Sequence, residues 1–361
     1  MEEHQCSSLD PVHNVFVQKL SHGQPIELQD INYYQKLYAD DVQQSPDEWK
    51  YATVLVSSNR ERLNICRMKA IMFAKENKTY VFKWKCKILQ EENRPPDSIM
   101  QHILEKHAFF WQYFVTGAPC NLSVNINGDV GLVNGSPATL HSLTFSDPDE
   151  HSRIVQHIDL DMSLPFGSKI EISQPLAVNV QITPTLDGKP ISQRRQKQLE
   201  QLRLVGIQEP HEDIIVLPLG QQKSLTKDDF NKYTYKIPTR TRMLSLASVS
   251  VHHIFPFDLA FAMTVHKAQG RTIARVVLDL TSHPSKYNQI QYAALFVAMS
   301  RVKQADHIRL LVHGDMDYLT SLRPEKNVMA FYHGYETSNV MGMTWAPSTA
   351  LQYLRQSDLP S

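Results

Sequence analysis

The chain has 361 residues, of which 42% are apolar and 20% are charged, so it is long enough to bury one large core or two smaller ones. This composition excludes a disordered or fibrous chain. Lys plus Arg number 37 and Asp plus Glu number 37, so the net charge of zero gives no global argument for a polyanionic partner. Any electrostatic argument must therefore be regional.

The four cysteines, Cys6, Cys66, Cys86 and Cys120, form no C-x-x-C pair, which argues against a disulfide framework and against a cysteine zinc site. We expect no metal site and a reducing compartment, either nucleus or cytoplasm, with the mitochondrion left open. The first residues are acidic and polar, and no run approaches the roughly 18 apolar residues of a membrane span. We therefore expect a soluble protein without a membrane partner.

Charge is segregated along the first quarter of the chain. Residues 1–50 hold nine acidic and three basic residues, and we interpret them as an acidic lead-in to a domain. Residues 51–90 hold nine basic residues and two acidic ones, so this second segment could face phosphate.

An α/β pattern occupies residues 51–116. The β-branched run at 52–58 predicts a buried strand, and a helix is expected over residues 59–76, where Leu63, Cys66, Ala70 and Phe73 recur at helical spacing. Residues 80–85 alternate aromatic with basic or aliphatic side chains and predict a half-exposed strand.

Residues 117–255 have a different texture, with short apolar runs interrupted by Gly, Pro, Asn and Asp, which is typical of small β modules. The runs that predict strands lie at 122–126, 138–145, 169–172, 178–182 and 214–217. A polar segment over residues 192–203 is interpreted as a solvated helix or a flexible insert. We expect this region to be a mostly β insertion.

The α/β pattern returns over residues 256–320. Asp258 is expected to cap a helix that runs to Gln269, and Gly270 suits the end of that helix. A strand at 275–280, a turn at 282–284, a helix with one apolar face from Tyr292 to Met299 and a strand at 308–312 follow. Strand, helix and strand of this length predict a βαβ unit and hence a parallel sheet. Residues 321–361 form a tail without an assigned role.

Two segments carry side chains suited to phosphate. The first is TVHKAQGRT at residues 264–272, where donor-rich residues meet a glycine that lets backbone N–H groups approach an anion. The second is AMSRV at 298–302, where Arg301 could offer a bidentate cation to a phosphoryl group. An ordinary helix end and a surface salt bridge are the respective alternatives.

Taken together, these segments resemble superfamily 1 DNA helicases of the Pif/RecD-like group. Residues 264–272 are similar to motif V of that family, and FVAMSRV at 296–302 is similar to motif VI. Upstream and in the expected order, VLVSSNRERLN at 54–64 resembles motif IV, and GLVNG at 131–135 resembles the turn that opens the SH3-like insertion. FVQKLSHG at 16–23 resembles the segment that leaves the first motor domain, so the likeness covers residues 13–315.

The resemblance implies roles at the nucleotide. Arg301 would be the catalytic arginine finger that contacts the γ-phosphate of ATP, and Gly270 and Thr272 would lie beside the nucleotide cleft. Arg62, with Asn59, would be the motif IV group near the nucleotide. Arg60 competes with Arg62 for that role, and a solvated side chain is the alternative for both.

The resemblance also implies a path for single-stranded DNA. Thr264, His266, Lys267 and Gln269 would lie on the DNA track, where phosphate contacts position the strand. Asn134 would approach DNA at the insertion, with a turn asparagine of positive φ as the alternative.

The sequence departs from the family where a motor needs its nucleotide-binding core. A P-loop, G-x-x-x-x-G-K-[ST], is absent, because the single Gly-Lys pair, Gly188-Lys189, is followed by Pro190. The acidic pairs at 47–48 and 149–150 follow proline-containing turns and not apolar strands, and the glycine-aspartate-glutamine pattern of motif III is missing. The sequence is therefore expected to correspond to a second motor domain and its insertion.

We expect an α/β fold with a RecA-like parallel sheet, interrupted by a mostly β, SH3-like module. The leading hypothesis is the C-terminal portion of an ATP-dependent 5′→3′ DNA helicase, with single-stranded DNA as partner and a second chain as a candidate source of the P-loop. ATP and Mg²⁺ are expected only in an enzyme that has the first motor domain. The alternatives are a non-catalytic nucleic-acid-binding or regulatory module and a truncated gene product.

Overall fold

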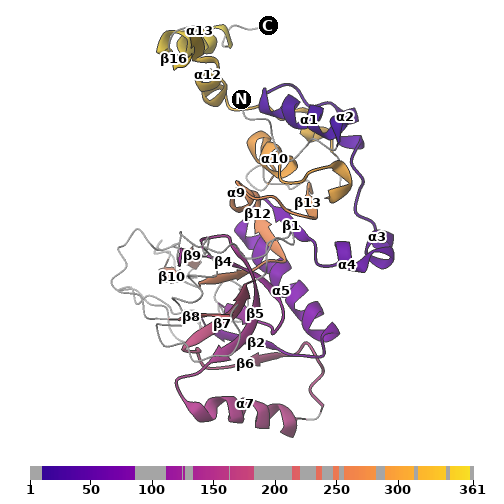
Figure 1. Cartoon of the computed structure of the whole chain (residues 1–361), viewed down its shortest axis with the longest axis vertical. Coiled ribbons are helices and arrows are strands. Elements are labelled where there is room, and N and C mark those ends of the chain that lie inside the picture. Colours follow the sequence, from indigo (N-terminus) through magenta and orange to yellow (C-terminus); the bar gives the residue numbers. More distant parts are fainter. Residues whose placement is uncertain are drawn as a thin grey trace, which may run out of the picture. The chain divides into compact units, whose positions relative to one another are not determined.

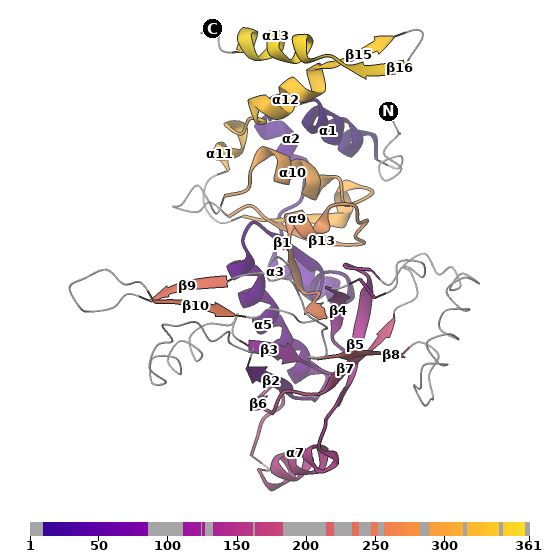
Figure 2. The ribbon, with the colours of Figure 1, turned by 90° about the vertical axis from the view of Figure 1, so that its left-hand side faces the viewer.

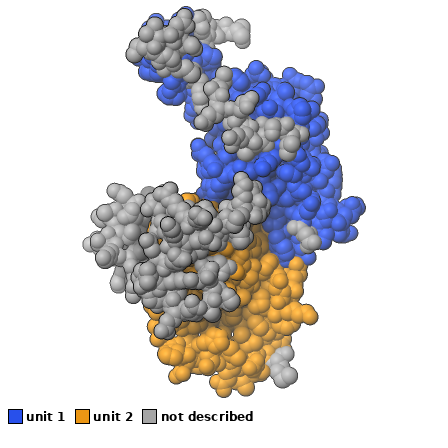
Figure 3. Space-filling model, viewed as in Figure 1, with its two compact units in different colours: residues 1–58, 263–361 blue, residues 59–262 orange. Residues whose placement is uncertain are grey.

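A computed structural model describes residues 10–85, 111–123, 125–126, 133–161, 163–182, 214–219, 233–237, 247–251, 256–281, 289–312, 316–338 and 342–357. The chain forms two compact units (Figure 3). Unit 1 contains residues 1–58 and 263–361, and unit 2 contains residues 59–262. The chain passes from unit 1 to unit 2 between residues 58 and 59 and returns between residues 262 and 263, whereas the sequence texture changes near 116 and 255.

Unit 1 is built on a four-stranded sheet of order β12-β1-β13-β14 (Figure 1), with β12 at Ala262–Thr264, β1 at Thr53–Val56, β13 at Val276–Asp279 and β14 at Ile308–Leu311. Strand β1 pairs with β13 in parallel, and β13 pairs with β14 in parallel. Helix α10 (Tyr292–Met299) connects β13 to β14 along the chain. The predicted βαβ unit and its parallel sheet are confirmed.

The core of unit 1 lies between this sheet and the N-terminal helices. These helices are α1 (Pro11–Ser21), α2 (Leu28–Asn32), α3 (Ala39–Gln44) and α4 (Pro46–Trp49). Helix α1 buries His13, Phe16, Val17 and Leu20, which recur at helical spacing and form one face. The acidic lead-in is thus part of the parallel-sheet unit.

The prediction of a helix from Asp258 to Gln269 is wrong. Residues Phe257–Leu259 form strand β11, which pairs with β4 (Pro119–Leu122), and Ala262–Thr264 form β12. The α-helix of this segment, α9, is confined to Val265–Ala268. Nearly every side chain from Phe257 to Val265 is buried. Pairing of this segment with a strand far away in the chain therefore outweighed the local tendency of Asp258 to cap a helix.

Unit 2 is mostly β, as expected for the insertion. Its five-stranded sheet has the order β11-β4-β5-β7-β8, and all of its pairings are antiparallel. The further strands of this sheet are β5 (Pro137–Thr144), β7 (Ala177–Ile182) and β8 (Ile214–Pro218). Strand β4 ends at Leu122, where the strand expected at 122–126 was to begin, so those predicted bounds are wrong. Helix α7 (Pro148–Leu160) connects β5 to a second sheet.

The second sheet of unit 2 has the order β3-β2-β6. Strand β2 (Val81–Lys85) pairs antiparallel with β3 (Trp111–Phe114) and parallel with β6 (Lys169–Glu171). The strand predicted at 80–85 exists, but its assignment to the RecA-like sheet is wrong, because its partners lie in unit 2. A separate hairpin is formed by β9 (Tyr233–Ile237) and β10 (Ala247–Val251).

Helix α5 spans Asn59–Glu76, the range predicted from its periodicity. It buries Arg62, Cys66, Ala70 and Ala74, so its inner face is the i, i+4 series that begins at an arginine. The Cys66 thiol donates to the carbonyl oxygens of Leu259 (3.4 Å) and Ala262 (3.6 Å). Burial raises the pKa of Cys66 to about 11, which keeps this thiol protonated.

Helix α11 (Asp317–Thr320) precedes the tail. The tail itself contains α12 (Lys326–His333), β15 (Tyr335–Ser338), β16 (Gly342–Trp345) and α13 (Pro347–Ser357) (Figure 2). Strands β15 and β16 form an antiparallel hairpin. The polar segment at 192–203 and the turn at 282–284 lie outside the described residues. Within the described part of the chain, no helix is long and apolar enough to cross a membrane.

Candidate functional site

The segment that resembles motif V lies at the end of β12 and continues through α9. Thr264 is the N-cap of α9 and is only 7% exposed, so its side chain is packed inside unit 1. Val265 and Ala268 are buried, and they turn the remaining side chains of α9 outward. His266, Lys267 and Gln269 are exposed as a result. Three of the four predicted DNA-track residues therefore lie side by side on the surface.

Gly270 ends this segment with a left-handed backbone conformation, φ +77°. A Cβ at this position would meet no atom within 4 Å, so glycine is needed here for its conformation and not for space. The backbone N–H of Arg271 donates to the carbonyl of Ala268 (3.1 Å), which closes the turn. The prediction that Gly270 terminates the helix is confirmed, and Thr272 follows as an exposed residue.

Arg301, in the segment that resembles motif VI, follows the C-terminal end of α10. Its side chain is partly buried, and its guanidinium group donates to three oxygen atoms of unit 1. Nε contacts the carbonyl of Val297 (2.9 Å), Nη1 contacts the carbonyl of Arg271 (3.2 Å), and Nη2 contacts Oγ of Ser300 (2.7 Å). These bonds hold the plane of the guanidinium group, which has five N–H donors in total.

The two segments are joined directly. Besides the bond from Arg301 to the Arg271 carbonyl, the N–H of Ile273 donates to the carbonyl of Arg301 (2.9 Å). Residues that are 30 positions apart in sequence thereby share one loop cluster. Gly270, Thr272 and Arg301, for which the family resemblance implies a place at a nucleotide cleft, belong to the same small region of unit 1.

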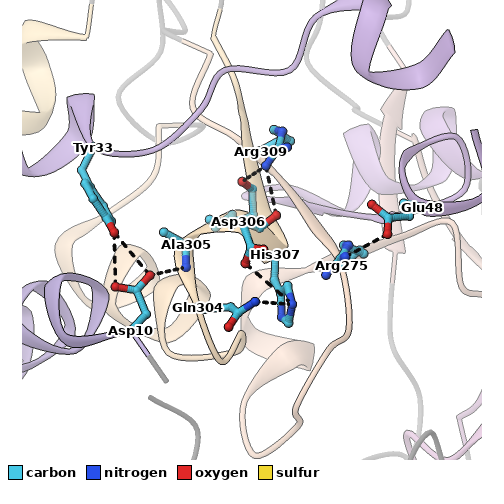
Figure 4. A network of polar contacts seen from close by, with 10 residues as sticks. Asp10, Tyr33, Glu48, Arg275, Gln304, Ala305, Asp306, His307 and Arg309 are labelled. Atoms are coloured by element: carbon cyan, nitrogen blue, oxygen red, sulfur yellow. Dashed lines mark hydrogen bonds and ion pairs between the residues drawn. The ribbon is translucent and has the colours of Figure 1, made fainter. Parts of the chain in front are cut away.

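Asp10, which the sequence analysis did not single out, anchors helix α1 to the loop that follows α10. Asp10 caps α1 by accepting from the N–H of His13 (3.0 Å), and it also accepts from the N–H of Ala305 (2.9 Å) and from the Tyr33 hydroxyl (3.2 Å). Figure 4 shows the contacts of Asp10 with Ala305 and Tyr33. The signal in the sequence was the Asp-Pro pair before an apolar helical stripe, which predicts a cap but not its second partner.

His13 is fully buried and its Nδ1 lies 2.8 Å from the Tyr34 hydroxyl. Its Nε2 has no hydrogen-bond partner. Burial lowers the pKa of His13, with Asp10 and the nearby backbone of Val302 acting in the opposite direction. The imidazole is therefore neutral at physiological pH, and it packs α1 against the end of α10.

The segment that resembles motif IV spans both units, since residues 54–58 belong to unit 1 and residues 59–64 to unit 2. Its two predicted site residues, Asn59 and Arg62, lie in unit 2 and form a different kind of site. Arg62 is 3% exposed, its Nε donates to Oδ1 of Asn59 (3.2 Å), and its Nη1 lies 3.2 Å from Oδ1 of Asp258. Asp258, expected to cap a helix, instead lies in β11 and pairs with this arginine. Arg60, the competing candidate, is exposed.

Asn134 lies on an exposed turn of unit 2. Its backbone N–H donates to Oδ1 of Asn125 (2.8 Å), and the positive φ of this turn belongs to Gly135 (+101°). The alternative of an asparagine with positive φ is therefore wrong. Gly131 and Leu132, the first residues of the same motif, lie outside the described residues.

The donor set fits a phosphate contact better than a metal ion. Arg301, Lys267 and the backbone N–H groups near Gly270 suit anions. Among the described residues, no group of three or more His, Cys, Asp or Glu side chains could hold a metal. The acidic pairs are engaged elsewhere, since Glu48 pairs with Arg275 (3.0 Å) and Glu150 pairs with Arg153 (3.5 Å). These residues do not fit Mg²⁺ bound to ATP.

No protein-family model and no curated protein matches the chain. Solved structures do match. They include the Pif1 helicase from Candida albicans (13% identity, TM-score 0.41, 90% of this chain and 58% of that chain). They also include a Bacteroides Pif1 helicase in complex with ADP-AlF3 and ssDNA (15%, TM-score 0.45, 90% and 54%) and Bacteroides Pif1 bound to ssDNA (14%, TM-score 0.41, 90% and 54%). The chain spans little more than half the length of these helicase chains.

Proposed function

We propose that the chain is the second motor domain, with its insertion, of an ATP-dependent 5′→3′ DNA helicase of superfamily 1. Unit 1 would be the RecA-like second motor domain, and the five-stranded sheet of unit 2 its SH3-like insertion. The observation that carries the proposal is the junction in unit 1, where Arg301 donates to the Arg271 carbonyl and accepts from the Ile273 N–H. Two segments that resemble motifs V and VI thus form one cluster.

The exposed side of this cluster supports a role in holding single-stranded DNA. His266, Lys267 and Gln269 are exposed along a single helical turn and its end. Side chains of this kind contact phosphate oxygens and position a strand without reading its sequence. Because part of the track would belong to another motor domain, affinity of this chain alone should be near the non-specific range, on the order of 10⁻⁴ to 10⁻⁶ M at physiological salt.

ATP hydrolysis is proposed to need a P-loop domain that this sequence does not contain. Such a domain would supply the lysine that holds the phosphates and the carboxylates that hold Mg²⁺. The contribution of this chain would be the planar, permanently charged guanidinium of Arg301, which stabilises charge on the transferred phosphoryl group. The chain alone should therefore show no ATPase above background, with or without single-stranded DNA.

The proposal is tested by titrating a fluorescently labelled single-stranded oligonucleotide with the full chain at several salt concentrations and recording anisotropy. Each phosphate contact contributes about −0.7 to the slope of log K against log salt, so Lys267→Ala should flatten the slope by about that amount. Lys326→Ala, at an exposed lysine of helix α12, is the matched control and should leave the slope unchanged. If Lys267→Ala left the slope of log K against log salt unchanged, helix α9 would not be part of the DNA track.

A second candidate is a nucleic-acid-binding module without a catalytic role. The bonds from Arg301 to Val297, Arg271 and Ser300 favour it, because they give the arginine a purely structural function in the chain as it stands. Adding a domain that carries a P-loop separates the two candidates. Appearance of DNA-stimulated ATPase supports the motor, and persistent inactivity with intact DNA binding supports the module.

A further inference from the structure

Lysine side chains gather on one face of the sheet β3-β2-β6 in unit 2. Lys83 of β2 is the register partner of Glu171 of β6, and Lys85 of β2 is the partner of Trp111 of β3. Paired residues lie on the same face of a sheet, and so do alternate residues of one strand. Lys83, Lys85, Trp111, Lys169 and Glu171 therefore share one face.

One carboxylate serves two of these lysines. Nζ of Lys83 lies 3.4 Å from Oε2 of Glu171, and Nζ of Lys85 lies 3.2 Å from Oε1 of the same group. The Lys83 ammonium also lies 3.8 Å from the ring centroid of Trp111. The indole is 6% exposed, so it forms the floor of the cluster and holds the lysine by a cation–π contact.

Positive charge on this face exceeds negative charge. Lys169 is exposed, and its pKa is lowered by partial burial and by repulsion from Arg67 and Lys83. Like charges gathered on a sheet face are destabilising, and a bound anion would relieve the repulsion. Lys85 is half-exposed, so its ammonium can exchange the contact with Glu171 for a contact with a ligand.

We propose that this face, formed by Lys83, Lys85 and Lys169, contacts the phosphodiester backbone of a nucleic acid. The choice of nucleic acid among polyanions rests on the proposed function. Lys83 and Lys85 are separated by about 6.8 Å along the strand, so each can meet a different phosphate. Because Trp111 is covered, the surface offers no ring for base stacking, and recognition should be independent of sequence.

The test uses the full chain with a labelled 20-nucleotide single strand and, in a second arm, a 20-base-pair duplex. Lys85→Gln combined with Lys169→Gln should flatten the salt slope by about 1.4 for the single strand or about 1.8 for the duplex, and the arm that responds identifies the form of the nucleic acid. Glu171→Gln should act in the opposite direction, with tighter binding, because it releases two lysines and removes a negative charge. Lys326→Gln, at an exposed lysine outside this sheet, is the control and should leave the slope unchanged.

The outcomes separate this surface from the segment in unit 1. If the double substitution flattens the salt slope and Lys267→Ala does not, the result supports the sheet face and contradicts the DNA track of α9. The reverse result overturns the sheet face. Absence of any binding at low salt overturns both. Equal binding of a polyglutamate of the same charge, with the same response to the substitutions, overturns nucleic acid as the partner. All substituted side chains are exposed, and unchanged denaturation curves verify the fold.

Discussion

Two segments that the sequence presents as equivalent carriers of positive charge have opposite environments in the structure. In unit 1, His266 and Lys267 extend from α9 into solvent. In unit 2, Arg62 is 3% exposed and is held by Asn59 and Asp258. The cations of the first segment are exposed on the surface, whereas the arginine of the second is buried against a carboxylate of its own unit. Similarity to a sequence motif identifies a charged residue, and the exposure of its side chain to solvent decides whether that residue can reach a ligand.

The reason for the difference lies in the helical phase of each residue. Arg62 begins the buried series Arg62, Cys66, Ala70 and Ala74, whereas Lys267 lies between the buried residues Val265 and Ala268 on the outer side of α9. A charged residue on the buried stripe of a helix needs a partner, because an unpaired charge away from water is costly. Asp258 is that partner, and it comes from a strand almost 200 residues further along the chain.

The largest expected effect concerns Arg301 in a motor completed by a P-loop domain. Arg301→Ala should lower ATP turnover by about 10³-fold or more, as for an arginine finger. Arg301→Lys should fail too, because an ammonium lacks the planar fork. Lys303→Ala, at an exposed neighbour, is the control in the same steady-state assay. Turnover that is indifferent to both changes at Arg301 would leave this residue with its structural hydrogen bonds only.

Next in size is the effect of Arg62→Ala on stability. Removing the guanidinium breaks the ion pair between the buried Arg62 and the partly buried Asp258, and we expect a loss of about 3 kcal/mol in the free energy of unfolding. Arg60→Ala, at an exposed position of the same helix, should change it by about 0.5 kcal/mol or less. Denaturant titration of the full chain measures both. Unchanged stability for Arg62→Ala would contradict the structural role and revive the role beside the nucleotide.

A smaller effect is expected for Gly270→Ala. The position has φ +77° and open space around it, so the cost is that of a left-handed backbone alone, about 1–2 kcal/mol. Thermal unfolding should show this loss. Gly270→Asn should be milder, because asparagine tolerates this conformation better. If Gly270→Asn lowered the free energy of unfolding much more than Gly270→Ala does, the turn would have close neighbours, in conflict with the open space around Gly270.

The smallest effect is a pH dependence from His13. Its pKa is lowered by burial, so below about pH 6.5 the unfolded chain binds a proton that the folded chain does not. The free energy of unfolding should therefore fall as pH drops below ~6.5 and should level off above it. His13→Gln should weaken this dependence, while the exposed His22→Gln should not. Because burial also lowers the pKa of His307, the difference between the two variants is the informative quantity.

Short-range patterns in the sequence were sufficient for several elements. The helix at Asn59–Glu76 and the helix at Tyr292–Met299 follow from apolar spacing, and the connection between β13 and β14 follows from element length. The left-handed turn at Gly270 follows from residue type. Each of these features depends on dihedral preferences and side-chain periodicity within a few turns of chain.

The sequence by itself determined several strands and helices, among them α5, α10, β13 and β14, and it located the residues around Gly270 and Arg301. The tertiary structure decided which strands pair, so β2 joined β3 and β6, and residues 257–264 became strands instead of a helix. It also decided that Arg62 is a buried ion pair and that Lys267 is exposed. Strand pairing and burial depend on contacts between residues far apart in the chain, and their energies outweigh local preferences that differ by about 1 kcal/mol or less.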